Sequence, residues 1–114
     1  MKAIGYFRVA SDASQDGTYT LKEQEKIFSL FCSESGYEPA TAFVDMDAGL
    51  RVSGTQYRSM LSYIWKNGGD FTVVVKSMQH LHPEPYELLR SLIELDVLGA
   101  KIHRSEERRV GKEC

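Results

Sequence analysis

Hydrophobic and polar positions follow one another along the chain in a way that predicts strands and helices in alternation. An apolar run rich in aromatic and β-branched residues covers residues 3–9 and stops at the polar residues 11–17, as expected of a buried strand that leads into a loop. Apolar residues then recur at near-helical spacing, and Thr20 with Glu23 has the form of a capping box. A helix is therefore predicted over residues 20–35.

Five further elements follow from the same pattern. They are expected at residues 42–45 (strand), 56–66 (helix), 71–75 (strand), 84–98 (helix) and 100–102 (strand). Apolar residues at i, i+3, i+4 and i+7 predict the first of these helices, and Asn67-Gly68-Gly69 should end it. Pro83 suits the first turn of the last helix, because its missing N–H would have no partner there in any case. The continuous apolar run from Phe71 to Val75 is typical of a strand covered on both faces and predicts the centre of the sheet.

Strands that alternate with helices imply right-handed crossovers and parallel pairing. We therefore predict a small α/β three-layer sandwich with a mainly parallel sheet and helices on both of its faces. The length of 114 residues and the hydrophobic content of 42% allow one core, which we assign to a single domain over residues 1–103. Residues 104–114 form a charge run without periodicity and are expected to be a disordered or non-native tail.

The net charge, the cysteines and the lack of long apolar runs indicate which partners and which cellular setting the chain can have. The net charge of -2 and the pI near 5.9 give no global attraction to nucleic acid, so any DNA contact must come from local clusters of arginines. The two cysteines have neither disulfide-framework nor metal-ligand spacing, which favours a reduced, cytoplasmic setting. No apolar run approaches the length of a membrane span, and the chain opens on a strand pattern, not on a secretory signal.

The most informative chemistry lies where the first strand ends. Arg8 closes the strand, Ser11 follows it, and Gln15 lies four residues beyond the serine. This arrangement places a candidate nucleophile beside a cation that can bind phosphate. Serine and aspartate also favour turns through hydrogen bonds from side chain to backbone, and for this segment alone that interpretation is the simpler one.

The pattern resembles the start of the serine recombinases, the resolvase and invertase family, in which a short strand delivers Tyr-x-Arg-Val-Ser and a glutamine follows the serine at that spacing. Other pieces of the family pattern match in order: Gln24 in Ser-Leu-x-x-Gln, Asp45 at the end of the second strand, Ser53-Gly54 for Ser-Gly, Arg58-Ser59-Met60-Leu61 for Arg-Pro-x-Leu, and the strand around residues 73–75. The resemblance extends from about Lys2 to Glu107 and implies a resolvase-like catalytic domain.

The resemblance also implies an activity, which is site-specific cleavage and exchange of DNA strands. In the family a serine attacks a backbone phosphate and forms a phosphoserine linkage, no metal or nucleotide cofactor takes part, and arginines stabilise the charge of the transition state. Carried onto this chain, the catalytic residues are Ser11, Arg8 and Arg58, and the residues expected to bind DNA or phosphate are Gln15, Gln24, Asp45, His80 and His82.

The expected partners are DNA and, through the family's long dimer helix, a second copy of the recombinase. That helix would begin where this sequence ends, so we interpret the chain as a fragment or a degenerate relative.

Two registers are open for the nucleophile. Aligned through Arg8 and Val9, the family's serine position falls on Ala10, which has no hydroxyl group. If the spacing from serine to glutamine is kept, Ser11 takes the position and Ala10 is an insertion, such as a bulge at the end of the strand. We favour the second register.

The family's Asp-Arg-Leu-x-Arg motif is altered in this chain. Residues 79–83 read Gln-His-Leu-His-Pro, so the two arginine positions hold His80 and Pro83 when the motif is anchored on Leu81, or Gln79 and His82 in the ungapped register. A histidine is mostly uncharged near neutral pH, which predicts a weakened site and weak or absent strand cleavage.

Other interpretations remain open. The chain could be a decayed homologue that serves as an interaction module for intact recombinase subunits. It could also be an unrelated flavodoxin-like or receiver-like domain, but the acidic cluster or glycine-rich first loop of such a domain is missing. His80 and His82 with Asp45 and Glu84 invite a metal site, yet spacing fixes no third ligand, and no metal is predicted.

Overall fold

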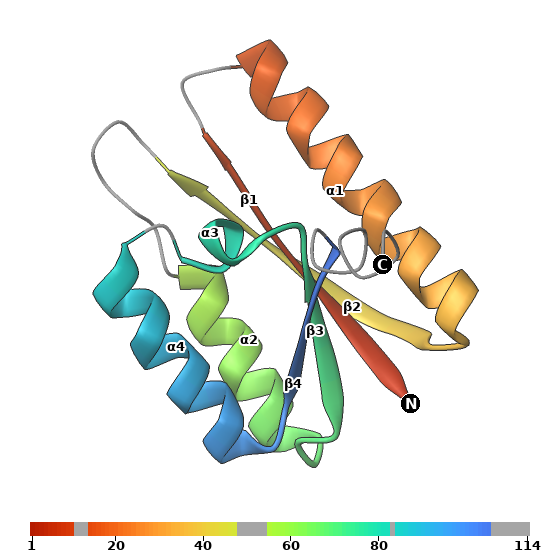
Figure 1. Ribbon diagram of the computed structural model, residues 1–114, viewed down its shortest axis with the longest axis vertical. Helices are drawn as coiled ribbons and strands as arrows, with labels where there is room; N and C mark the ends of the chain where they lie inside the picture. The colour runs from red at the N-terminus through yellow and green to blue at the C-terminus, as the bar shows by residue number, and fades with distance from the viewer. Residues whose placement is uncertain (11–13, 48–54, 83, 106–114) are drawn as a thin grey trace, which may run out of the picture.

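The chain alternates strands and helices around a single sheet (Figure 1). The computed structural model describes residues 1–10, 14–47, 55–82 and 84–105. Its elements in chain order are β1 (Lys2–Ala10), α1 (Ser14–Ser35), β2 (Glu38–Asp47), α2 (Thr55–Lys66), β3 (Phe71–Val75), α3 (Met78–Leu81), α4 (Pro85–Leu98) and β4 (Lys101–Arg104).

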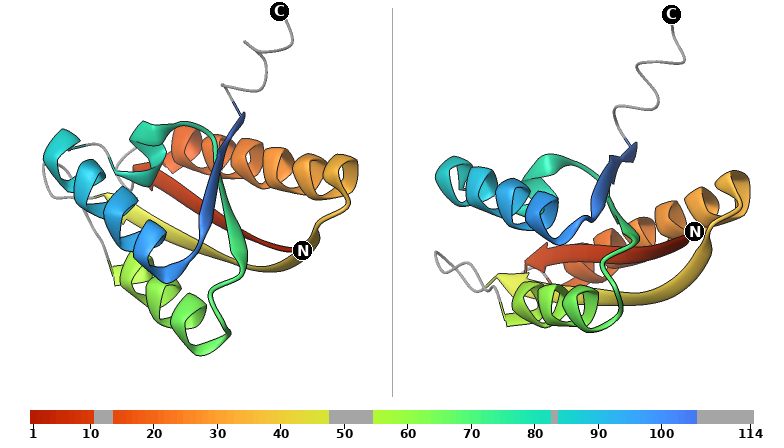
Figure 2. Two further views of the ribbon diagram at one scale, coloured as in Figure 1. Left: turned by 60° about the horizontal axis from the view of Figure 1, so that its bottom comes forward. Right: turned by 90° about the horizontal axis from the view of Figure 1, so that it is seen from below.

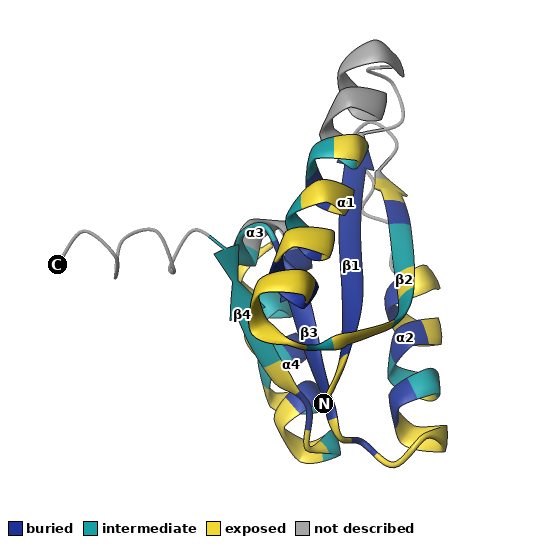
Figure 3. Cartoon of the chain, turned by 90° about the vertical axis from the view of Figure 1, so that its right-hand side faces the viewer, coloured by how far each residue is buried: buried dark blue, intermediate teal, exposed yellow. Residues whose placement is uncertain are grey.

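The four strands form a parallel sheet in the order β2-β1-β3-β4. β3 has a strand on each side, as its apolar run predicted, and shares the centre of the sheet with β1. Val73 and Val75 are 0% and 1% exposed, and both central strands are buried along most of their length (Figure 3). The predicted α/β class with a parallel sheet is confirmed.

Helices cover both faces of the sheet, which gives three layers (Figures 1 and 2). The α1 face holds a buried cluster of Ala3, Phe7, Phe28, Phe31, Cys32 and Val74. The opposite face holds a larger cluster that joins the sheet to α2, α3 and α4 and includes Ile4, Tyr6, Tyr57, Met60, Ile64, Val73, Leu81 and Leu95. Side chains alternate between faces along β1, so Arg8 lies on the same face as Tyr6, toward α2 and α4.

The first helix is longer than predicted. It begins at Ser14, whereas the capping-box pattern at Thr20 predicted a start six residues later, and residues 14–17 are helical instead of forming a loop. A capping box is a pattern of residue types that a helix interior also tolerates, and serine with a nearby aspartate suits an earlier first turn equally well. β2 is longer than expected for a different reason, since its backbone pairs with β1 from Glu38 to Asp47 whatever its side chains are.

The segment after β3 also differs from the prediction. The residue pattern predicted no element between the strand at 71–75 and the helix at 84–98, but Met78–Leu81 forms the short helix α3, and His82 follows as its C-cap. The next helix, α4, begins at Pro85 with Glu84 as its N-cap, while Pro83 lies outside the described residues.

The predicted helix ends are confirmed. α2 ends at Lys66, before Gly68 and Gly69, and α4 ends at Leu98, before Gly99. These three glycines have φ values of 96°, 81° and 88°, in the left-handed range that glycine adopts without strain. A Cβ on Gly69 would also lie 2.3 Å from the carbonyl oxygen of Leu98, so the turn before β3 packs directly on the end of α4.

Candidate functional site

The candidate residues gather at the edge of the sheet where the strands have their carboxyl ends. Arg8 lies near the end of β1, Asp45 lies near the end of β2, and the two are neighbours in the register between these strands. α3 follows β3 at the same edge and contacts β1. Ligands of open parallel α/β sheets bind at this edge.

Arg8 is a buried arginine, with 6% of its surface exposed. Its Nη2 donates to the hydroxyl oxygen of Tyr6 at 2.7 Å and lies 3.4 Å from the carbonyl oxygen of Leu81. A guanidinium group stays charged when buried, so neighbouring acceptors must replace water. The Arg8 side chain is therefore a fixed cation between β1 and the end of α3.

The side chain of Gln24, on α1, forms two hydrogen bonds with the main chain of Arg8. Its Oε1 accepts from the backbone N–H of Arg8 at 3.1 Å, and its Nε2 donates to the backbone carbonyl of Arg8 at 3.1 Å. β1 pairs with β3 only from Lys2 to Gly5, so beyond that point the Gln24 amide supplies the partner that a strand would otherwise provide. With 2% of its surface exposed, Gln24 is placed to position Arg8.

Asp45 joins the end of β2 to the start of α2. Its Oδ1 accepts from the backbone N–H of Gln56 at 3.0 Å, and its Oδ2 accepts from the backbone N–H of Tyr57 at 2.9 Å. These N–H groups belong to the first turn of α2, where the helix dipole favours a negative charge. Asp45 is 1% exposed and so acts from inside the protein to hold the helix that carries Arg58.

Tyr6 links Arg8 to Asp45, and sequence reasoning did not single it out as a site residue. Its hydroxyl group accepts from Arg8 and donates to Oδ2 of Asp45 at 2.6 Å. The period of two along a strand could have placed Tyr6 beside Arg8, because positions i and i+2 share a face. The pairing with β2 that brings Asp45 opposite has no comparable signal in the sequence.

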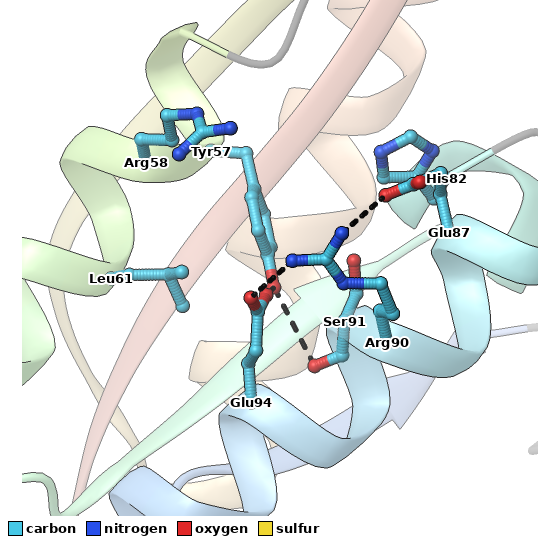
Figure 4. A pocket seen from close by; sticks show the side chains of 8 residues that line it. All are labelled: Tyr57, Arg58, Leu61, His82, Glu87, Arg90, Ser91 and Glu94. Carbon is cyan, nitrogen blue, oxygen red and sulfur yellow. Dashed lines mark hydrogen bonds and ion pairs between the residues drawn. The ribbon is translucent and has the colours of Figure 1, made fainter.

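A polar pocket of about 100 Å³ lies between α2 and α4 (Figure 4). It is lined by Tyr57, Arg58, Leu61, His82, Glu87, Arg90, Ser91 and Glu94. The structure thus brings Arg58 and His82, two of the predicted site residues, to one cavity. His82 follows Leu81, whose carbonyl oxygen binds Arg8, so the pocket adjoins the buried Arg8 network.

The pocket contains two guanidinium groups in different surroundings. Arg58 is exposed, and no hydrogen bond or ion pair joins it to another residue in the described part of the chain. Arg90 lies 3.9 Å from a carboxylate oxygen of Glu87 and 3.9 Å from one of Glu94, too far for direct hydrogen bonds. Sequence reasoning missed Arg90, because a charged residue on an amphipathic helix is usually a solvent-facing one.

Tyr57 lines the same pocket with a buried ring that is 6% exposed. Its hydroxyl group donates to Oε1 of Glu94 at 2.8 Å. Burial raises the pKa of Tyr57 well above its usual range, and the Glu94 carboxylate raises this pKa further. The Tyr57 hydroxyl group is therefore a hydrogen-bond donor, not a base, at neutral pH.

Replacing Tyr57 with phenylalanine is expected to flatten the fall in stability at alkaline pH. The pKa of Tyr57 is higher in the folded chain than in the unfolded chain, where it is about 10. Above that pH the folded chain binds more protons than the unfolded chain, so the free energy of unfolding falls as pH rises. Urea unfolding at about pH 8 and about pH 10.5 measures the slope. Tyr86→Phe, which alters an exposed tyrosine, is the control, and a Tyr57→Phe slope as steep as that of the wild type would contradict the prediction.

The remaining predicted residues lie partly or wholly outside the described part. Ser11 is outside it, and for Gln15 and His80 only the backbone is described, in the first turn of α1 and within α3. Arg8 through Ala10 pair regularly with Asp45 through Asp47, so the bulge suggested for the end of this strand is not seen, and the register shift lies at Ala3/Ile4 instead.

Two further observations concern metals and membranes. Among the described residues, no three histidine, cysteine, aspartate or glutamate side chains lie close enough together to hold a metal ion. Within the same part of the chain, no helix has both the length and the apolar character needed to cross a bilayer.

Comparisons with known proteins agree with this architecture. The family model described as the resolvase N-terminal domain matches residues 3–112. A crystal structure of a resolvase family site-specific recombinase from Streptococcus pneumoniae superposes with a TM-score of 0.76 at 20% identity, covering 94% of this chain and 73% of that chain. The N-terminal catalytic domain of TP901-1 integrase superposes with a TM-score of 0.73 at 18% identity, covering 94% of this chain and 78% of that chain. No curated protein sequence matches this chain.

Proposed function

This chain belongs to the resolvase N-terminal domain family, and we propose that it is a catalytic domain for site-specific DNA recombination whose own strand cleavage is weak or absent. In the proposed reaction the Ser11 hydroxyl group attacks a backbone phosphate. A phosphoserine bond forms, the bond from phosphorus to the leaving deoxyribose oxygen breaks, and that oxygen takes up a proton. Arg8 and Arg58 stabilise the charge on the phosphate, DNA is the partner, and the protein acts in the cytoplasm.

The proposal that strand cleavage is weak rests on the residue types at positions 79–83, a segment that lies partly beside the pocket. α3 and its C-cap present His82 to the pocket, and residues 79–83 contain no arginine. The removal of one preorganised donor from a site that stabilises an oxyanion costs about 10²–10³ in rate. Two missing arginines therefore predict a cleavage rate many orders of magnitude below that of an intact site.

The roles of the buried residues follow from their hydrogen bonds. Gln24 and Asp45 support the proposed reaction by positioning, because Gln24 holds the backbone of Arg8 and Asp45 holds the first turn of α2. Tyr6 joins the Arg8 side chain to Asp45 and keeps Arg8 in place. Arg58 is exposed on α2, which allows it to contact a phosphate group directly.

A second function, a non-catalytic interaction module, is favoured by exposed apolar side chains on α2 and α4. Trp65 is 75% exposed, Ile93 is 56% exposed and Val97 is 78% exposed, and they line one groove with Leu61 and Leu98. Contiguous exposed apolar surface of this kind marks protein contacts. In this alternative the chain associates with intact recombinase subunits without cutting DNA itself.

The test of the proposed function is the search for a covalent protein–DNA adduct. The chain is incubated with supercoiled plasmids that carry a library of genomic inserts, and adducts are trapped by denaturation in detergent. An active serine recombinase on its own site shows that trapping works, and Ser11→Ala sets the background. We expect the chain to give no adduct above that background. An adduct that depends on Ser11 would show that this chain is a working enzyme and overturn the weak-activity proposal.

A further inference from the structure

We propose that the pocket between α2 and α4 is an oxyanion site in which Arg90 joins Arg58 in binding one phosphate group. The choice of a DNA backbone phosphate as the ligand rests on the proposed function, whereas the oxyanion chemistry rests on the pocket itself. Arg90 has no counterpart among the residues that the family resemblance singled out. It comes from α4 and not from the altered segment at residues 79–83.

The size and lining of the pocket fit a small oxyanion. The volume of about 100 Å³ is large enough to admit a phosphate group. Arg58 approaches from α2 and Arg90 from α4, so the two planar donor groups lie on different walls of the cavity (Figure 4). A guanidinium group donates two parallel hydrogen bonds to phosphate oxygens, and two such groups can hold a tetrahedral anion from two sides.

Both guanidinium groups have donors to spare for a ligand. Arg58 has no hydrogen-bond or ion-pair partner among the described residues. Arg90 lies 3.9 Å from Glu87 and 3.9 Å from Glu94, which is beyond hydrogen-bonding distance. Arg90 therefore forms ion pairs with both carboxylates but donates a hydrogen bond to neither. A phosphate at ordinary bonding distance would offer Arg90 shorter contacts than either carboxylate does.

Glu87 and Glu94 set the strength of the site. Their two negative charges offset the two arginines, which makes the pocket nearly neutral and the binding of an anion weak. Glu94 also accepts from Tyr57, which holds it in place. The Glu87 side chain is 44% exposed, and Arg90 is its ion-pair partner among the described residues. Glu87 is therefore the carboxylate that competes most simply with an incoming phosphate, and removal of its charge should strengthen binding.

The experiment is a titration of the full chain followed by NMR signals from the Nε–Hε groups of its arginines. Inorganic phosphate is the first probe, and a short DNA duplex is the second. We expect both probes to shift the Arg58 and Arg90 signals together and more than those of other arginines. Arg90→Gln should weaken phosphate binding about tenfold or more, and Glu87→Gln should strengthen it severalfold. Lys66→Gln removes an exposed positive charge at the end of α2 and should change nothing.

Several outcomes would overturn the inference. Unchanged affinity in Arg90→Gln would remove Arg90 from the site, and equal shifts at all arginines would show binding without a defined site. Shifts with inorganic phosphate but not with the duplex would reject DNA phosphate as the ligand. Because none of these results depends on strand cleavage, failure here leaves the adduct experiment to judge the proposed function separately.

Discussion

Replacing Asp45 with alanine is expected to lower the free energy of unfolding by about 3–5 kcal/mol. Among the described residues, the substitution leaves three donors without their acceptor: the hydroxyl group of Tyr6 and the backbone N–H groups of Gln56 and Tyr57. Asp45 is 1% exposed, so water cannot replace the carboxylate without disturbing the packing around it. A loss of this size is a large fraction of the stability of a domain of this length.

Two variants make this prediction specific. Asp45→Asn keeps the shape of the side chain but exchanges one acceptor oxygen for a donor, and should cost about half as much as alanine. Asp70→Ala removes an exposed aspartate at the turn before β3 and should change stability by less than about 0.5 kcal/mol. Urea unfolding measures all three. A cost for Asp45→Ala within 1 kcal/mol of that for Asp70→Ala would contradict the buried network as described.

The sequence predicted those elements whose buried positions follow from the pattern of apolar residues within the element itself. β3 was recognised because all five of its residues are buried and apolar or β-branched, which only a covered strand requires. α2 was recognised because Tyr57, Met60 and Ile64 recur on one helical face, and that face is the buried one. In both cases the pattern is confined to a single element, so no knowledge of its neighbours was needed.

Features that depend on neighbours were not predicted. The short helix α3 has too few residues to show a period, and its buried Leu81 is fixed by contacts with β1 and α4. The contact between Tyr6 and Asp45 depends on the register of β2 against β1, which the alternation of residues along either strand leaves open. The roles of Gln24 and Arg90 have the same origin, since each depends on a partner more than ten residues away or on a cavity between two helices.

The family resemblance supplied what periodicity could not. It directed attention to Arg8, Asp45 and Arg58, and the structure places all three at the carboxyl edge of the sheet or beside its pocket. The structure adds the physical reason why they occur together: Asp45 holds the helix that carries Arg58 and, through Tyr6, the side chain of Arg8. The residues that position Arg8 and Arg58 are therefore present in this chain, whereas the two arginines of the altered motif are absent.

Restoring both arginines of the motif is expected to raise the yield of covalent protein–DNA adduct by more than about 100-fold over background, because each preorganised donor contributes about 10²–10³ in rate. The structure favours one register for the restoration. Leu81 is 0% exposed and its carbonyl oxygen accepts from Arg8, so Leu81 is fixed in place and is the natural anchor for the leucine of Asp-Arg-Leu-x-Arg. The double variant expected to work is therefore His80→Arg with Pro83→Arg.

The matched control is the double variant Gln79→Arg with His82→Arg, which adds the same charge in the other register and should stay at background. Both double variants are assayed against the same plasmid library as the wild type, and thermal unfolding confirms that each is folded. Ser11→Ala in the active double variant should abolish the adduct. Because β1 pairs regularly through Ala10, a restored adduct that appears only after Ala10→Ser would move the nucleophile to position 10. An adduct that survives Ser11→Ala while position 10 is still alanine would assign the attack to neither of these two positions. If neither double variant gives an adduct, with or without Ala10→Ser, the missing arginines are not the cause of the absent strand cleavage.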